Sequence, residues 1–113
     1  LAVLERILTG HTGWVTSVAV SPDGTWAASG AGNPSNPDST VKIWDLETGQ
    51  CWATLKGHTA DVRSVAITPD GKRILSGSFD KSVRVWDAGS GREVAKLEDH
   101  TNRVFSVVAF GVG

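Results

Sequence analysis

The sequence has little of several features that would assign a protein to a familiar class. It holds one cysteine, Cys51, so no internal disulfide can form, which favours a reducing compartment such as the cytoplasm. No apolar run approaches the roughly 20 residues that cross a bilayer, and the N-terminal segment lacks the layout of a signal peptide. Methionine is absent as well, so we expect a fragment or a trimmed chain.

An excess of charge of one sign is also missing. The chain has 11 basic and 12 acidic residues, well interspersed, with a formal net charge of −1. A protein that binds nucleic acid or an anionic membrane surface carries a basic patch. The sequence therefore predicts that neither nucleic acid nor a membrane is a partner.

What the chain does contain is an internal repeat. Residues 11–30 and 58–77 are identical at eleven of twenty positions, and each copy runs on to a Trp-Asp pair that ends at Asp45 or Asp87. A third copy begins at His100 and is soon broken off. A period of about 40 residues is the signature of an architecture whose units stack to bury their apolar faces.

Short β-branched runs separated by turn signals predict an all-β meander with almost no helix. The Pro-Asp-Gly segments at 22–24 and 69–71 put proline and glycine where turn geometry suits them. Four strands are expected in each full copy, at residues 15–20, 25–29, 40–44 and 50–55 in the first, and at residues 62–67, 73–78, 82–86 and 93–97 in the second.

These motifs resemble those of the WD40 family. The Gly-His pairs at 10–11 and 57–58, the Ser-Gly pairs at 29–30 and 76–77, and both Trp-Asp pairs match its pattern. The resemblance implies β-propeller blades, each a four-stranded antiparallel sheet packed against the next. Residues 1–113 would then be a partial propeller, with an outer strand at 1–9, a first blade at 10–56, a second blade at 57–98, and a truncated third repeat at 99–113 that adds one inner strand.

Histidine, serine and aspartate recur together, which is the raw material of a nucleophilic triad. The resemblance implies instead a structural hydrogen-bond set that includes tryptophan, and a buried imidazole or carboxylate is costly unless it is paired. Two identical sets in one chain also favour a scaffold. We therefore predict no catalytic residue and no cofactor, but two structural sets: His11, Ser29, Asp38 and Trp44 in the first copy, and His58, Ser76, Asp80 and Trp86 in the second.

A metal site is not expected either. The histidines His11, His58 and His100 occupy equivalent places in successive repeats, so a propeller would hold them on separate blades. Zinc needs four ligands around one ion, often including thiolates. The one thiol, Cys51, falls in a predicted outer strand, where we expect it to be packed.

Positions at which the repeats differ are candidates for binding, because the scaffold leaves them free. The residue before the first inner-strand valine is Trp14, Asp61 or Arg103, and the family pattern places it near one rim of the propeller. Phe79 and its counterpart Pro37 come just before the structural aspartates. Aromatic and arginine residues dominate interface hot spots. These five residues are the candidate partner-binding positions, although each could instead pack against a neighbouring blade.

Two further features separate the first copy from the second. The first copy is five residues longer, within residues 31–37, and this stretch is either a tolerated insertion or a binding loop. Trp26 and Trp52 fall inside predicted strands, where we expect them to pack against neighbours and not to recognise a partner.

Two and a half repeats would leave apolar sheet faces in water unless something covers them. The favoured hypothesis is a non-catalytic scaffold for protein–protein interaction that closes a ring head to tail with copies of itself. With two blades per chain, three chains would give six blades and four would give eight. The alternative is a structural propeller fragment whose only activity is self-assembly, and a propeller enzyme ranks below both.

Overall fold

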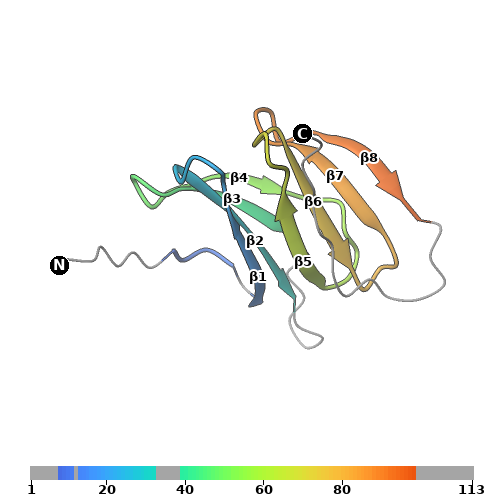
Figure 1. Cartoon of the computed structure of the whole chain (residues 1–113). Coiled ribbons are helices and arrows are strands. Elements are labelled where there is room, and N and C mark those ends of the chain that lie inside the picture. Colours follow the sequence, from blue (N-terminus) through green and yellow to red (C-terminus); the bar gives the residue numbers. More distant parts are fainter. Residues whose placement is uncertain (1–7, 12, 33–38, 99–113) are drawn as a thin grey trace.

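A computed structural model describes residues 8–11, 13–32 and 39–98, which form two four-stranded antiparallel sheets. In each sheet the strands follow one another in chain order, and the two sheets are neighbours that pack face to face (Figure 1). The first sheet contains β1 (Trp14–Val20), β2 (Trp26–Gly32), β3 (Val41–Asp45) and β4 (Cys51–Leu55). The second contains β5 (Val62–Ile67), β6 (Arg73–Ser78), β7 (Val83–Asp87) and β8 (Glu93–Leu97).

The all-β prediction is confirmed, and β5, β6 and β8 have the predicted bounds. The largest difference is at β2, which runs on to Gly32 because Trp14 and Val15 of β1 pair with Gly32 and Ala31. The predicted strand at residues 1–9 lies mostly outside the described residues, and the truncated repeat at 99–113 lies outside them altogether.

The two Pro-Asp-Gly turns are built in the same way. Asp23 Oδ1 accepts hydrogen bonds from Ser21 Oγ at 2.8 Å and from the Thr25 amide at 3.0 Å. These bonds, those from Thr25 foremost, lower the pKa of the Asp23 carboxyl. In the second turn Asp70 Oδ1 bonds to Thr68 Oγ1 at 2.6 Å and to the Lys72 amide at 2.9 Å. Gly24 and Gly71 complete the turns at φ of 76° and 72°, which a residue with a Cβ rarely adopts.

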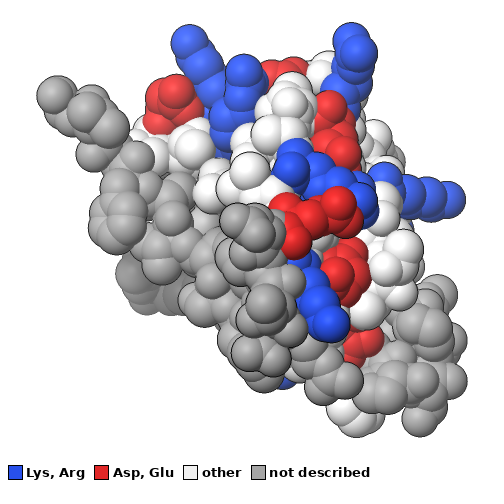
Figure 2. All heavy atoms as spheres, turned by 90° about the vertical axis from the view of Figure 1, so that its right-hand side faces the viewer, with Lys and Arg blue, Asp and Glu red and all other residues white. Residues whose placement is uncertain are grey.

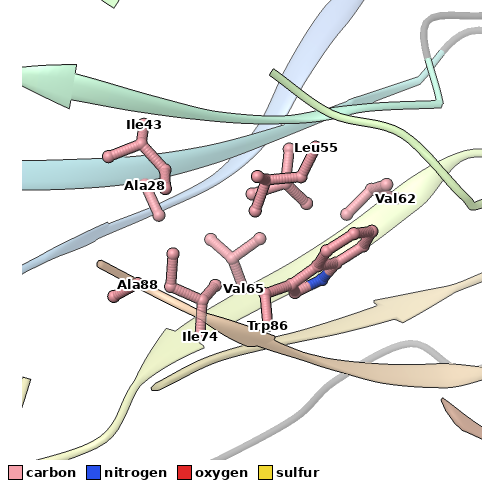
Figure 3. Packing of buried hydrophobic residues seen from close by; sticks show 9 residues of the cluster. Ala28, Ile43, Leu55, Val62, Val65, Ile74, Trp86 and Ala88 are labelled. Carbon is pink, nitrogen blue, oxygen red and sulfur yellow. The ribbon is translucent and has the colours of Figure 1, made fainter. Parts of the chain in front are cut away.

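The core lies between the two sheets, as Figure 3 shows. The first sheet contributes Ala28, Ile43 and Leu55, and the second contributes Val65 and Trp86 among others. Burial of such apolar side chains stabilises the pair by about 25 cal/mol for each Å² removed from water. Because one core joins both sheets, the repeats depend on each other for their burial.

The inner strand β5 crosses β2 at very short range. A Cβ added to Gly30 would lie 2.5 Å from Val62 Cγ1, and one added to Gly32 would lie 2.4 Å from Asp61 Cβ. Side chains of β1 also reach the second sheet, since Thr16 Oγ1 donates to the Val62 carbonyl and the Val65 amide donates to Ser17 Oγ at 3.1 Å. The backbones therefore approach closely because the sequence places glycine at the crossing.

The expected packing of Cys51 is wrong. This residue begins the outer strand β4, where its thiol is exposed and lies 3.3 Å from the Ala53 carbonyl oxygen. An outer strand buries side chains only where a neighbouring blade covers them, and at Cys51 the second sheet does not.

Candidate interaction surfaces

The structure brings together all four members of the set predicted for the second copy. Trp86 Nε1 donates to Ser76 Oγ at 2.8 Å, and Ser76 Oγ lies 2.7 Å from His58 Nε2. His58 Nδ1 in turn lies 2.8 Å from Asp80 Oδ2. The carboxylate can only accept, so the imidazole carries its proton on Nδ1 and accepts the Ser76 hydroxyl proton at Nε2. One chain of donors and acceptors thus runs from the indole to the carboxylate.

The electrostatics of this set match that arrangement. Burial lowers the pKa of His58, and the attraction of Asp80 offsets only part of the effect, so the imidazole is neutral at pH 7. Burial alone would raise the pKa of Asp80, but hydrogen bonds from Ser82, His58 and the Thr59 amide lower it to about 2. The set therefore holds a neutral imidazole and a fully ionised carboxylate.

The first copy repeats this geometry as far as the described residues reach. Trp44 Nε1 donates to Ser29 Oγ at 2.8 Å, and His11 Nε2 lies 2.7 Å from the same oxygen. The imidazole and indole centroids are 6.2 Å apart in the first sheet and 6.3 Å apart in the second. Asp38, the predicted fourth member, lies outside the described residues.

The Gly-His pairs have a steric basis in the same sets. A Cβ added to Gly10 would lie 3.2 Å from Trp44 Cη2, and one added to Gly57 would lie 3.2 Å from Trp86 Cη2. Each tryptophan therefore packs its ring edge over a glycine just before the histidine with which it shares a serine.

Strand β1 exposes an apolar surface, which we call the bare face: Val15, Val18 and Val20. Trp14 begins the same strand but pairs with Gly32, so it does not belong to this face. The counterparts of the bare face in the second sheet are covered. Val15 is 53% exposed where Val62 is fully buried, and Val18 is 59% exposed where Val65 is 6% exposed. The difference arises because the first sheet covers β5, while no described residue covers β1 in the same way. A cavity of about 100 Å³ opens on this face beside Val15, Val18 and Trp44.

The second sheet has a surface that complements the bare face. We call it the far face: Leu75, Val83, Val85 and Leu97. Its counterparts in the first sheet, Ala28, Val41, Ile43 and Leu55, form the wall on which the second sheet packs. Leu55 is 3% exposed, whereas Leu97 is 54% exposed. The far face is therefore equivalent to the surface of the first sheet on which the second sheet packs.

The candidate partner-binding residues have different surroundings. Trp14 is 68% exposed. Asp61 differs from the expectation of an accessible rim position, because it is buried against Gly32 where β5 crosses β2. Phe79 is half-buried, and Arg63 Cζ lies 5.1 Å from the centroid of its ring. Arg103 and Pro37 lie outside the described residues.

A second surface is a cleft of about 350 Å³ between the turns of the two sheets. Trp26 lines it and packs against the core, in line with the expected packing. The same expectation fails for Trp52, which is 49% exposed beside the cleft. Sequence reasoning missed this cleft. An alignment of equivalent strands would have marked both tryptophans as differences between the copies. Their places in β6 and β8 are taken by Arg73 and Val94.

The face of the described residues that Figure 2 presents carries charges of both signs. Acidic and basic side chains are interspersed on it. Among residues 8–11, 13–32 and 39–98, no three His, Cys, Asp or Glu side chains are grouped to hold a metal. The same residues include no helix with the length and apolar character needed to cross a bilayer.

Two meander sheets of four antiparallel strands, packed face to face with repeated internal geometry, are successive blades of a β-propeller. The sequence profile of the WD40 family, described as "WD domain, G-beta repeat", matches residues 2–45 and 49–87. This chain belongs to the WD40 repeat family.

Relatives and solved structures agree with this assignment. The chain is 52% identical to pre-mRNA-splicing factor prp46 of Emericella nidulans over 52 residues, which cover 46% of this chain and 10% of the relative. It is 46% identical over 50 residues to protein pleiotropic regulator PRL2 of Arabidopsis thaliana, covering 44% of this chain and 9% of that protein. The structure of U3-55K superposes with a TM-score of 0.79 at 28% identity, covering 87% of this chain and 30% of that one. The chain thus spans about a tenth of these curated relatives.

Proposed function

We propose that this chain is a non-catalytic scaffold that binds other proteins, and that it completes a propeller by packing head to tail with copies of itself. Membership of the WD40 family and the names of its relatives, which include splicing factors, support a role in protein assemblies. The observation that carries the self-assembly is the contrast between β1 and β5, whose equivalent valines are exposed in one strand and buried in the other.

Two copies could reproduce the packing that already joins the two sheets. The bare face of one copy has the valines of the buried β5, and the far face of another has the aliphatic residues of the wall beneath it. At the contact between two copies, Leu97 of one copy would pack beside Trp44 of the other. Within the chain, Leu55 already packs in the core with Trp86 in the same way. Such head-to-tail contacts close into a ring when the rotation between successive blades divides a full turn.

The geometry of the repeated sets supports a role without catalysis. Ser76 is fully buried, and its oxygen already bonds to Trp86 and His58. A nucleophile must reach a substrate carbon, and the repeated geometry is that of a fixed hydrogen-bond network. A propeller enzyme therefore remains the less favoured alternative.

The mass of the chain in solution at micromolar concentration tests the proposal. We expect the mass of three or four copies by light scattering. Val18→Lys places a charge on the bare face and should lower the mass, whereas Gln50→Lys adds the same charge in an exposed turn and should leave it unchanged. A mass of one chain for the unsubstituted protein contradicts the self-assembly and leaves the family assignment intact.

A structural fragment with self-assembly as its only activity is the alternative. Capture of a specific partner by the assembled protein, lost in Trp14→Ala while the mass is retained, favours the scaffold. The same assay without any partner favours the alternative. The cytoplasmic location stays a prediction, based on the single cysteine.

A further inference from the structure

The cleft between the turns has an aromatic and an acidic side. Trp26 and Trp52 line it together with Asp45 and Glu47, all from the first sheet and the turn between β3 and β4. The second sheet contributes only small residues to the cleft, namely Gly71, Ala88 and Gly89. Its volume of about 350 Å³ is near the lower end of the range of ligand sites, roughly 300–1,000 Å³. The cleft therefore has room for one side chain with indole rings and carboxylates around it.

The second sheet has an ion pair at the equivalent position. Arg73 of β6 pairs across the strands with Asp87 of β7, and Arg73 Nη1 lies 2.7 Å from Asp87 Oδ1. The guanidinium therefore neutralises the aspartate of the Trp-Asp pair. This ion pair belongs to the second blade, and no equivalent pair forms among the described residues of the first.

In the first sheet the residue opposite the equivalent aspartate is Trp26, which pairs with Asp45. Asp45 Oδ1 accepts hydrogen bonds from the Glu47 amide at 2.9 Å and the Thr48 amide at 3.4 Å. Among the described residues, no lysine, arginine or histidine forms an ion pair with Asp45. The first blade thus has an indole where the second blade has a guanidinium.

We propose that this cleft binds an arginine side chain of a partner protein. The proposal rests on the scaffold function and names the chemistry of one contact. An arginine can stack its planar guanidinium on an indole while it bonds to a carboxylate, and this combination strengthens when water is excluded. The partner's arginine would then pair with Asp45 as Arg73 pairs with Asp87 within the chain.

Arginine fits this cleft better than lysine for two reasons. Its guanidinium is flat and weakly hydrated, so it stacks on aromatic rings where an ammonium group stays hydrated. Its fork of N–H donors can also bond to Asp45 while others point toward Glu47, which lines the same cleft. The structure therefore favours a protein ligand with an exposed arginine over a general cation.

The test uses the assembled protein and the peptide acetyl-Gly-Arg-Gly-amide at low salt. We expect saturable shifts of the indole N–H signals of Trp26 and Trp52 in NMR spectra, while those of the buried Trp44 and Trp86 stay in place. The matched peptide with citrulline keeps the shape but lacks the charge, and it should bind about tenfold more weakly. Equal binding of the citrulline peptide, or of a lysine peptide, contradicts the proposal.

Two variants locate the binding in the cleft. Asp45→Asn keeps an oxygen for the turn amides but removes the charge, so binding of the arginine peptide should weaken about tenfold. Trp26→Arg rebuilds the ion pair of the second sheet and should abolish binding while the variant folds, as judged by circular dichroism. Gln50→Lys, in the adjacent turn, does not line the cleft and controls for the added charge in Trp26→Arg. Unchanged binding in both cleft variants overturns the proposal, even where the peptide binds.

The result can be separated from the fate of the scaffold proposal. Loss of peptide binding at an unchanged oligomer mass refutes the arginine site alone. A mass of one chain with the peptide still bound to the cleft refutes the self-assembly alone. Both readouts come from the same unsubstituted sample, so neither experiment depends on the success of the other.

Discussion

One hydroxyl oxygen in each sheet joins a tryptophan of the third strand to a histidine that precedes the first strand. In the second sheet this oxygen belongs to Ser76, and the chain of hydrogen bonds continues through His58 to Asp80. Each group has one protonation state that satisfies its partners, namely a neutral imidazole and an ionised carboxylate. Protonation of the imidazole or of the carboxylate is therefore linked to the loss of this hydrogen-bond network.

Acid should weaken the fold in two steps. The pKa of His58 is lowered from 6.5 in the folded protein, so the unfolded chain binds this proton first and stability falls as the pH drops below 6.5. The pKa of Asp80 is lowered from 3.8 to about 2, so its contribution is present above pH 3.8 and is lost as the pH falls toward 2. The free energy of unfolding, measured with urea at fixed protein concentration across this range, should follow both steps.

The first step can be assigned by a variant. His58→Asn removes the titrating imidazole, so the slope between pH 6.5 and the carboxylate range should shrink even though the variant starts from lower stability. A slope equal to that of the unsubstituted protein would contradict this assignment. NMR signals of the His58 ring protons provide a direct check, since they should titrate below the ordinary pKa.

At the scale of elements, the crossing of β5 over β2 sets the distance between the sheets. Gly32 is the tightest point, because an added Cβ would lie 2.6 Å from Asp61 Cα and backbone atoms cannot turn aside. Ala27, Ala28 and Ala31 keep the rest of β2 small and buried. The contact between the two sheets is therefore closest at Gly32.

Gly32→Ala should lower the free energy of unfolding by about 1–3 kcal/mol, the usual cost of overpacking. Gly89→Ala is the matched control, since the nearest atom to its added Cβ is Asp87 Oδ2 at 3.7 Å. The control should stay within about 0.5 kcal/mol of the unsubstituted protein. Equal urea midpoints for the two variants would show that the crossing tolerates a methyl group.

Elements were predictable from the sequence where their causes are local. Short β-branched runs and the Pro-Asp-Gly turns predicted the strands and their order, and the resemblance to the WD40 family implied which residues share a hydrogen-bond set. Burial was harder to predict, because it depends on which layer covers a residue. Asp61 and Trp14 hold equivalent places, yet only Asp61 lies under another sheet. The cleft beside Trp52 was missed for the same reason, since it forms only where turns of two blades meet.

At the scale of the whole molecule, the described residues form one interface between blades and leave two faces without a covering sheet among them. The interface within the chain removes the valines of β5 from water, whereas the bare face and Leu97 of the far face leave comparable side chains exposed. Surfaces of this kind are uncommon on soluble monomers and mark sites of association. The stability of the fold should accordingly depend on the protein concentration, which sets how many copies associate.

We expect the midpoint of thermal unfolding to rise with protein concentration, because association stabilises the folded state by mass action. Val18→Lys should reduce this dependence, and Gln50→Lys should retain it. Differential scanning calorimetry over a hundredfold range of concentration would measure the effect. A midpoint that stays constant over that range would contradict assembly through the bare face.

The placement of the five tryptophans has an optical consequence. Trp44 and Trp86 lie in dry surroundings beside their serines, whereas Trp14 and Trp52 face water on two separate surfaces. Indole fluorescence shifts toward the blue as water leaves its surroundings, so each surface carries its own chromophore. Binding of a partner at Trp14 would alter the emission of that residue, and occupation of the cleft would alter that of Trp26 and Trp52. The chain therefore reports the state of both surfaces without an attached dye.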